Sequence, residues 1–226
     1  GMAPGVMNYL GGRPSVSPCI KLYSFLMDKD LVDVSVNIDD KLTSVDIADN
    51  NSAKEIANLV NASFDSTGVS ATASTTVKME MLSTDAAGNH VVGFDLFGKN
   101  STAQAISATV TLGTTAATSD LTNLRDAINS YSSTTGIRAT LNANKNAIII
   151  VQDEGEDVVV QNLDFASVGN SVNTKLQMTS MNMDQDVTGT TKQVLDTDHD
   201  SGGSDSIRYA GQVKFHSSQT FTIVGN

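Results

Sequence analysis

The sequence of 226 residues contains a single cysteine, Cys19, and no tryptophan. One cysteine excludes an intrachain disulfide framework and a zinc site built from several cysteines. Basic residues are also scarce, with 14 Lys and Arg against 25 Asp and Glu and a formal net charge of −11. Because phosphate binding needs clustered Lys and Arg, we expect no nucleic-acid partner. The negative charge is more typical of a protein kept soluble by self-repulsion.

Long apolar runs are missing as well. No stretch reaches the roughly 20 apolar residues that a membrane-spanning helix requires, so we expect no membrane partner. The first residues also lack the basic and then apolar pattern of an ordinary signal peptide. Charged residues make up only 17% of the chain, and the balance is Ser, Thr, Asn and Gly. This composition suits β-rich extracellular surfaces, and the length suffices for one large or two small domains.

A segment that occurs twice is the main positive feature. Residues 52–72 and 120–140 align without a gap at an offset of 68 residues. The identical positions are Asn61 and Asn129, Thr67 and Thr135, Gly68 and Gly136, Ala71 and Ala139, and Thr72 and Thr140. A period of this length indicates a duplicated structural module.

The first copy predicts a helix between strands. Ser52 and Glu55 form a capping-box pattern at the helix start, and Gly68 is expected to end the helix in a left-handed conformation. Apolar residues at helical spacing predict the buried face, and they are Ile56, Leu59, Val60 and Phe64. Alternating apolar and polar residues predict strands on both sides, at 32–38, 42–47, 69–73, 77–81 and 91–97.

The second copy repeats this order. Asp120 is expected to cap its helix and Gly136 to end it. The predicted apolar face consists of Leu121, Leu124, Ile128 and Tyr131. The predicted strands are 107–112, 137–141, 147–151 and 158–165.

The two ends of the chain repeat less clearly. Residues 1–31 hold all three prolines and predict an irregular leader. One or two strands are expected within 172–183, where Met178, Met181 and Met183 are interpreted as core residues. A polar loop is then expected at 188–205, and alternation within 207–223 predicts a closing hairpin.

These elements predict an α+β fold that is elongated and β-rich. Its two tandem modules each pack antiparallel strands on one short amphipathic helix, because a few short strands cannot stay folded alone. The predicted divisions are a leader at 1–31, modules at 32–104 and 105–170, and C-terminal strands with a closing hairpin at 171–226, packing on the modules.

The repeated residues resemble the hook IN motif of bacterial flagellins and hook-associated proteins. The residues that carry the resemblance are Val60-Asn61 with Thr67-Gly68-Val69-Ser70-Ala71, and Ile128-Asn129 with Thr135-Gly136-Ile137-Arg138-Ala139. The C-terminal segments 211–215 and 221–223 are also similar to strands of flagellin middle regions. The resemblance spans roughly residues 31–226.

The resemblance implies the outer, variable region of a flagellin-like protein. Such proteins polymerise through long terminal helices, which the proline-containing residues 1–31 cannot form. The resemblance therefore implies a structural, non-catalytic role in motility, an extracellular location on the flagellum, and flagellin-like subunits as partners. Without such helices we expect a monomer in solution. A cell-surface adhesin or carbohydrate-binding module is the alternative, and an unrecognised hydrolase is a second one.

No catalytic, cofactor-binding or metal-binding residue is predicted. Asn61 and Asn129 are interpreted as structural, with side-chain amides that bond the loop after each helix. The acidic stretch at 196–202 resembles the start of a calcium loop. Its glycine, Gly202, comes one residue late, and Ile207 stands where the last ligand should be, so a solvated loop is favoured.

The three histidines, His90, His199 and His216, are far apart in sequence and form no metal-binding pair. No Gly-x-Ser-x-Gly elbow or phosphate-binding glycine loop supports an enzyme. Surface Ser and Thr could carry O-linked glycans, as flagellin middle regions often do, but the sequence identifies no acceptor.

Overall fold

The computed structural model describes residues 7–10, 33–38, 41–48, 51–83, 87–166, 174–185, 187–196, 205–219 and 221–225, and the findings below concern these. The strands are β1 (Met7–Leu10), β2 (Asp33–Ile38), β3 (Lys41–Asp46), β4 (Val69–Ser83), β5 (Gly88–Phe97), β6 (Gln104–Leu112), β7 (Ile137–Leu141), β8 (Ala147–Gln152), β9 (Val158–Ala166), β10 (Lys175–Met181), β11 (Val187–Asp196), β12 (Ile207–Tyr209), β13 (Gln212–Ser217) and β14 (Thr222–Gly225). The helices are α1 (Ala53–Ala62), α2 (Phe64–Thr67), α3 (Thr122–Ser130) and α4 (Ser132–Thr135), with a 3₁₀ turn at Ala116–Thr118.

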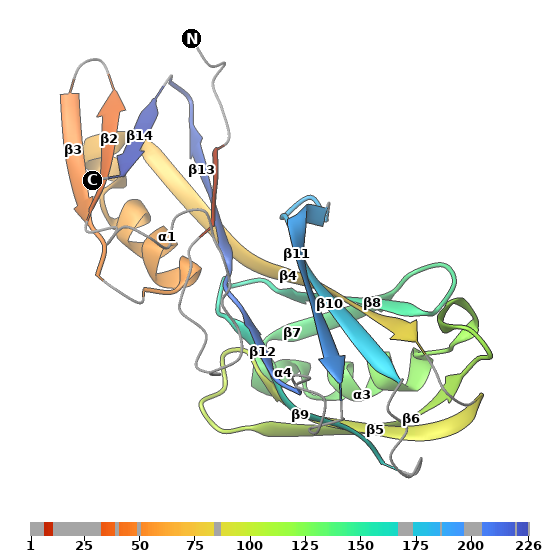
Figure 1. Cartoon of the computed structure of the whole chain (residues 1–226). Coiled ribbons are helices and arrows are strands. Elements are labelled where there is room, and N and C mark those ends of the chain that lie inside the picture. The colour runs from red at the N-terminus through yellow and green to blue at the C-terminus, as the bar shows by residue number, and fades with distance from the viewer. Residues whose placement is uncertain are drawn as a thin grey trace.

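These strands form three antiparallel sheets. A seven-stranded sheet has the path β1-β13-β4-β10-β11, with β8 also paired to β4 and β7 paired to β8. A four-stranded sheet has the order β12-β9-β5-β6, and a three-stranded sheet has the order β14-β2-β3. The molecule is elongated, with the long strand β4 running from one end towards the other (Figure 1). The predicted class, an elongated, β-rich α+β fold with short helices on antiparallel strands, is confirmed.

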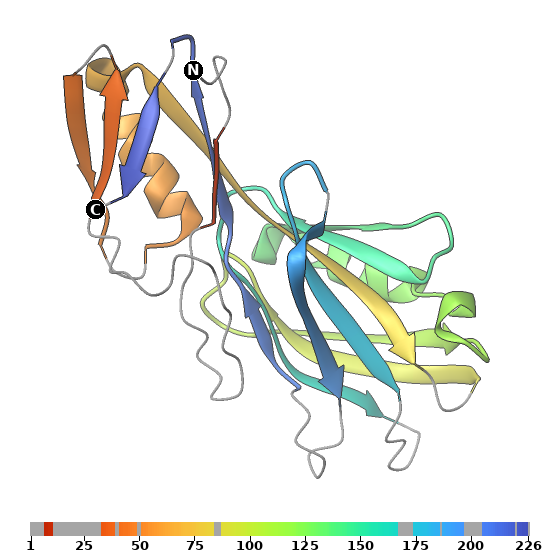
Figure 2. The ribbon, with the colours of Figure 1, turned by 45° about the horizontal axis from the view of Figure 1, so that its top comes forward.

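The strands and helices form two units with the same arrangement of elements. The first unit contains β2, β3, α1, α2, the start of β4, β13 and β14, and the second contains β5, β6, α3, α4, β7, β8 and β9. In each unit three antiparallel strands accompany one longer helix and one further strand pair. The three strands are β14-β2-β3 in the first unit and β9-β5-β6 of the four-stranded sheet in the second, and the strand pairs are β4-β13 and β7-β8. Figure 2 shows the two units as separate lobes joined by β4 and by the chain that leads into β13.

The strand registers show that the first unit is discontinuous in sequence. Ala139 in β7 lies opposite Ile150 in β8, and the equivalent Ala71 in β4 lies opposite Phe215 in β13. Both Ile150 and Phe215 are fully buried. The C-terminal strand β13 therefore takes the position in the first unit that β8 takes in the second.

The local sequence explains why the two copies separate at this point. The second copy turns back at 142–146, where Asn142 accepts from the Ala147 amide through its side chain and Lys145 has a positive φ of 61°. The first copy has Ser-Thr-Thr-Val-Lys at the corresponding 74–78. Thr and Val favour extended backbone, so β4 continues straight for 15 residues and leads into the second unit.

Each unit has its own apolar core. The first core is formed by Val45, Ile47, Ala53, Ile56, Ala57, Val60, Val69, Ala71, Val213 and Phe215. The larger second core lies among α3, the four-stranded sheet and the half of β4 that pairs with β8 and β10, and includes Met79, Leu96, Leu124, Ile128, Ile150 and Tyr209. Met178 belongs to this core, as predicted. Met181 is also buried, whereas Met183 is half-buried.

The helix faces differ in part from the prediction. In α1 the buried face is Ala53, Ile56, Ala57 and Val60, whereas the expected Leu59 and Phe64 are 37% and 48% exposed. In the second copy Tyr131 is 39% exposed. For Phe64 and Tyr131 the reason is that α1 and α3 end before these positions, whereas Leu59 lies within α1 on its exposed side. Backbone at Ser63 and Tyr131 leaves the helical conformation, so the apolar stripe does not continue through these residues.

The helix starts agree with the prediction in one copy. Ser52 is the N-cap of α1, its hydroxyl accepts from the Glu55 amide at 3.3 Å, and the Glu55 carboxylate accepts from the Ser52 amide at 2.6 Å. In the second copy the N-cap is Leu121 rather than Asp120. Asp120 still accepts from the Thr122 amide at 2.9 Å, and it bonds to the Thr122 hydroxyl at 2.6 Å.

Three predictions for the chain ends are wrong. Met7–Leu10, within the expected irregular leader, is a strand paired with β13, and Val187–Asp196, within the expected loop, is a strand paired with β10. The rest of 1–31 and residues 197–204 lie outside the described residues. The expected closing hairpin does not form, because β12, β13 and β14 each join a different sheet. The predicted domain boundaries stay a prediction. The 104/105 boundary falls within β6, which pairs along its length with β5.

Candidate functional site

The repeated asparagines hold the strand that follows each helix. The Asn129 side chain donates to the Ala139 carbonyl at 2.9 Å and accepts from the Ala139 amide at 2.8 Å. Asn61 forms the same pair of bonds with Ala71, at 2.9 Å and 2.7 Å. Each amide thus substitutes for a neighbouring strand by pairing with both peptide groups of one residue. The partner lies in the strand itself rather than in the loop that the sequence suggested.

The repeated Thr-Gly pair shapes the turn between helix and strand. Thr135 donates its hydroxyl to the Tyr131 carbonyl at 3.0 Å and accepts from the Ile137 amide at 3.1 Å. Thr67 makes the same contacts in the first copy. Gly68 and Gly136 have φ of 63° and 69°, as expected for left-handed helix ends. The distinctive side chains of both copies are therefore engaged with their own backbone.

The predicted chemical candidates do not come together. His90 is buried at the start of β5, whereas His216 lies half-buried in β13 of the other unit, with Nε2 3.2 Å from the Thr72 hydroxyl. His199 lies outside the described residues. So does most of the acidic stretch 196–202, of which only Asp196 is described, as the last residue of β11. In the described part of the chain no three His, Cys, Asp or Glu residues are grouped to hold a metal.

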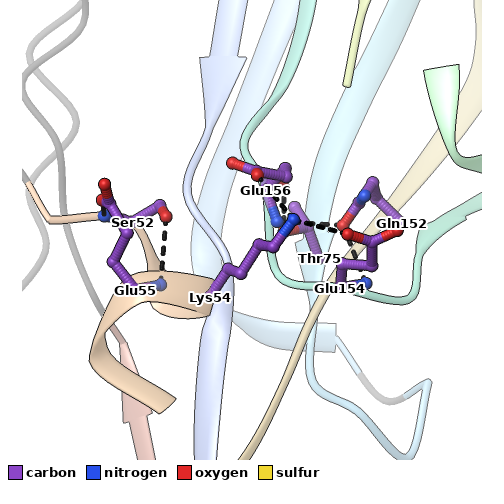
Figure 3. A network of polar contacts seen from close by, with 7 residues as sticks. All are labelled: Ser52, Lys54, Glu55, Thr75, Gln152, Glu154 and Glu156. Carbon is purple, nitrogen blue, oxygen red and sulfur yellow. Dashed lines mark hydrogen bonds and ion pairs between the residues drawn. The ribbon is translucent and has the colours of Figure 1, made fainter. Parts of the chain in front are cut away.

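The structure adds a network of polar contacts between the units that the sequence did not indicate (Figure 3). The Lys54 ammonium lies 2.5 Å from Glu154 Oε2 and 3.1 Å from Glu156 Oε1. The Lys54 amide also donates to the Gly155 carbonyl at 3.2 Å, and the Thr75 hydroxyl donates to the Glu156 carbonyl at 2.6 Å. Together with Gln152 and Gly211 these residues form what we call the inter-unit junction.

The electrostatics of the junction are those of a surface ion pair. Hydrogen bonds from Lys54, followed by its charge, lower the pKa of Glu154 below its ordinary value. The same bonds, to Glu154 first and Glu156 second, raise the pKa of Lys54. Because these side chains are 28–46% exposed, solvent screens the attraction. The sequence contained no local signal for this contact, since its partners are about 100 residues apart.

A second ion pair, between Arg208 and Asp157, is shielded from solvent, and Asp157 directly follows Glu156 of the junction. Arg208 in β12 binds Asp157 with Nη2 to Oδ2 at 2.5 Å and Nε to Oδ2 at 2.7 Å. The side chains are 15% and 7% exposed. This pair ties β12 to the residue that precedes β9 and was not found from the sequence.

Comparison with known proteins identifies one segment. Residues 95–154 match the family model of the flagellin hook IN motif. This span begins in β5 and includes β6, α3, α4, β7 and β8 of the second unit. The predicted resemblance to bacterial flagellins and hook-associated proteins is confirmed. The matched span contains the second copy, and the first copy remains a predicted second motif that the structure shows to have the same hydrogen bonds.

Among solved structures, the chain is similar to the D1-D2-D3 domains of the flagellar cap protein FliD from Escherichia coli, with 16% identity and a TM-score of 0.20. The alignment covers 71% of this chain and 55% of that chain, so this chain spans about half the length of that structure. No curated protein sequence is significantly similar to the chain. In the described residues no helix is long and apolar enough to cross a membrane.

Proposed function

Because residues 95–154 carry the flagellin hook IN motif, we propose that this chain is the outer, surface-exposed region of a flagellar structural protein. Its role is non-catalytic. The observation that supports the proposal is that the motif's own side chains form hydrogen bonds with the backbone of their own module. Asn129 and Thr135 both bind backbone groups of the same module, so the motif supplies architecture.

The proposed location is the extracellular face of the flagellum. A net charge of −11 favours hydration and mutual repulsion of neighbouring outer regions. Exposed Ser and Thr along β6, α4 and the intervening turn add polar surface without charge. In the proposed assembly, contacts between subunits are made by other segments of the flagellar protein, and this chain alone is a monomer in solution.

Immunogold electron microscopy tests the location. Antibodies raised against the purified chain are applied to unpermeabilised cells of the source bacterium, with pre-immune serum as the control. Gold along the filaments or at their tips is the expected result. Label confined to the cell body, with bare flagella, would contradict the proposal.

Two further measurements separate the alternatives. Sedimentation of the purified chain should give a monomer, and filaments formed by the chain alone would contradict that part of the proposal. Binding to a glycan array at micromolar affinity would favour an adhesin or carbohydrate-binding module instead. The large exposed aromatics among the described residues, Phe64 and Tyr131, lie in different units and make no shared platform.

A further inference from the structure

The chain crosses between the two units at two places that lie side by side. One crossing is within β4, which pairs with β13 as far as Ser74 and with β8 from Thr75 onwards. The other is the link from β12 to β13, and Gln212 at its end is the register partner of Ser74. These two segments form a narrow ribbon, and no partner strand of β4 continues past it, because β13 pairs with β4 only up to Ser74 and β8 and β10 pair with β4 only beyond that residue. The crossings alone therefore do not fix the angle between the units.

The inter-unit junction lies beside this ribbon and joins three backbone segments. The first turn of α1 contributes Lys54, whose amide and ammonium both bind the turn after β8. The Thr75 hydroxyl donates a hydrogen bond to the Glu156 carbonyl in the same turn. Figure 3 shows Lys54 reaching from α1 across to Glu154 and Glu156. A change of angle at the ribbon would have to break the bonds of Lys54, which join α1 to this turn.

Two glycines allow these segments to approach closely. Gly155 has a φ of 80°, and a Cβ atom there would overlap the Ala73 side chain and lie 3.0 Å from the Lys54 nitrogen. A Cβ at Gly211 would lie 2.7 Å from Thr75 Oγ1, 2.8 Å from Ala53 Cβ and 2.8 Å from the Gly155 carbonyl. Side chains essentially never pack at such distances, so both positions require glycine for this arrangement.

A buried side chain shapes the turn that enters the junction. Gln152 is fully buried, and its Oε1 accepts from the Glu154 amide at 3.0 Å and from the Glu156 amide at 2.9 Å. These bonds hold the turn so that the Gly155 carbonyl points to Lys54. Gln152 is thus a positioning residue for the contact between units rather than part of a binding site.

From these contacts we propose that the junction is a brace that holds the two units at one fixed angle. The described part of the chain then behaves as a single rigid body although it has two separate cores. The ion pairs contribute little because they are exposed. The close approach of Gly155 to Ala73 and Lys54, and of Gly211 to Ala53, sets the angle. A fixed angle would hold in any assembly, so its test is independent of the immunogold experiment.

The test is a distance measurement between the units in the full chain. Cys19 is replaced by Ser, and cysteines for spin labels are placed at the exposed residues Asn58 on α1 and Ser107 on β6. Pulsed electron spin resonance should give one narrow distance distribution for this parent protein. Gly155→Ala and Gly211→Ala should each broaden or shift the distribution, with helix and sheet content unchanged by circular dichroism.

Two glycine variants serve as matched controls. Gly68 also has a left-handed backbone, but a Cβ there meets nothing within 4 Å, so Gly68→Ala should keep the narrow distribution. Gly93 has an ordinary φ and an ordinary contact of 3.7 Å to the Ile106 carbonyl, so Gly93→Ala should keep it too. If the junction glycine variants fail to fold, the pair Thr75→Val and Lys54→Met is measured instead. A broad distribution in the parent, or no change in any folded junction variant, would overturn the brace.

Discussion

Phe215 in the C-terminal strand β13 lies opposite Ala71 in β4, where Ile150 lies opposite the equivalent Ala139 in the second unit. Phe215 is fully buried among residues of α1, β3 and β4. A residue near the end of the chain therefore completes the core that the first repeated segment begins. The second unit lies, in sequence, between these two parts of the first.

Replacing Phe215 should therefore loosen the first unit selectively. Phe215→Ala leaves a cavity in that core, and such changes cost about 3–5 kcal/mol of stability. Hydrogen exchange should accelerate at the amides of α1 and the start of β4, with smaller changes in α3. The reciprocal variant Ile150→Ala should accelerate exchange in α3 and β7. Equal effects of either variant on both units would contradict two separate cores.

The amide of Asn129 should be important for stability. Asn129→Ala removes both bonds to Ala139 and leaves its peptide group unpaired on that side, at a cost of about 2 kcal/mol. Urea unfolding of the purified chain measures this difference. Asn58→Ala, at an exposed position of α1, is the control and should stay within about 0.5 kcal/mol of the parent. A similar small effect at Asn129 would show that its bonds are dispensable.

The two helix-ending glycines should differ in sensitivity. Both have a left-handed backbone, in which alanine costs about 1–2 kcal/mol. At Gly68 a Cβ meets open space, whereas at Gly136 it would lie 3.1 Å from Gln152 Nε2 and 3.3 Å from Lys99 Cδ. Thermal unfolding should therefore show a larger loss for Gly136→Ala than for Gly68→Ala. A loss at Gly136 no larger than the loss at Gly68 would mean that the Gln152 and Lys99 side chains move aside without a cost in stability.

Acid sensitivity should depend on Asp120. Its bonds to Thr122, the hydroxyl first and the amide second, hold the pKa of Asp120 below the ordinary value of an aspartate. The folded state thus favours the ionised form, and this contribution is present above about pH 4, the pKa of an unfolded aspartate. The contribution is lost as the pH falls through the lowered pKa of the folded state. Asp120→Asn should lose less stability on acidification below pH 4, as followed by urea midpoints, and an unchanged profile would contradict it.

The Arg208–Asp157 pair should show the behaviour of a shielded ion pair. Arg208→Met leaves the carboxylate of Asp157, 7% exposed, without its cationic partner, and such changes cost about 3–5 kcal/mol. Replacing both residues, as Arg208→Met with Asp157→Leu, should restore much of the loss, because an apolar pair needs no compensation. Denaturant midpoints of the two variants make the comparison. A double variant as unstable as the single one would show that Asp157 has a role beyond this pair.

Features set by neighbouring residues were predictable. The capping box of Ser52 and Glu55 and the helix ends at Gly68 and Gly136 depend on contacts within a few residues. Strands such as β2 and β8 were predictable because their own residues carry the alternating or apolar pattern of a strand. The repeat also identified Asn61 and Asn129 as structural, since identical spacing implies identical local bonding. The sequence suggested that their side chains bond the loop after each helix, whereas in the structure they bond a residue of the following strand.

Features set by distant partners were not predictable. Strand β11 has polar residues that indicate a loop, yet its backbone pairs with β10. The three C-terminal strands alternate as a hairpin would, yet each pairs with a strand far away in sequence. The exposure of Phe64 and Tyr131 depends on where the helix geometry ends. The inter-unit junction joins Lys54 to Glu154, and no spacing rule connects residues so far apart.

The linear order of residues was enough to establish two copies of one helix–turn–strand design, because that design is held by bonds between near neighbours. It was also enough for the flagellar resemblance, which rests on the same local residues. How the copies are completed was decided only in three dimensions. Burial of apolar side chains selects β13 as the partner of β4, and close packing at Gly155 and Gly211 joins the two units. Both depend on backbone segments that meet only after the chain has folded.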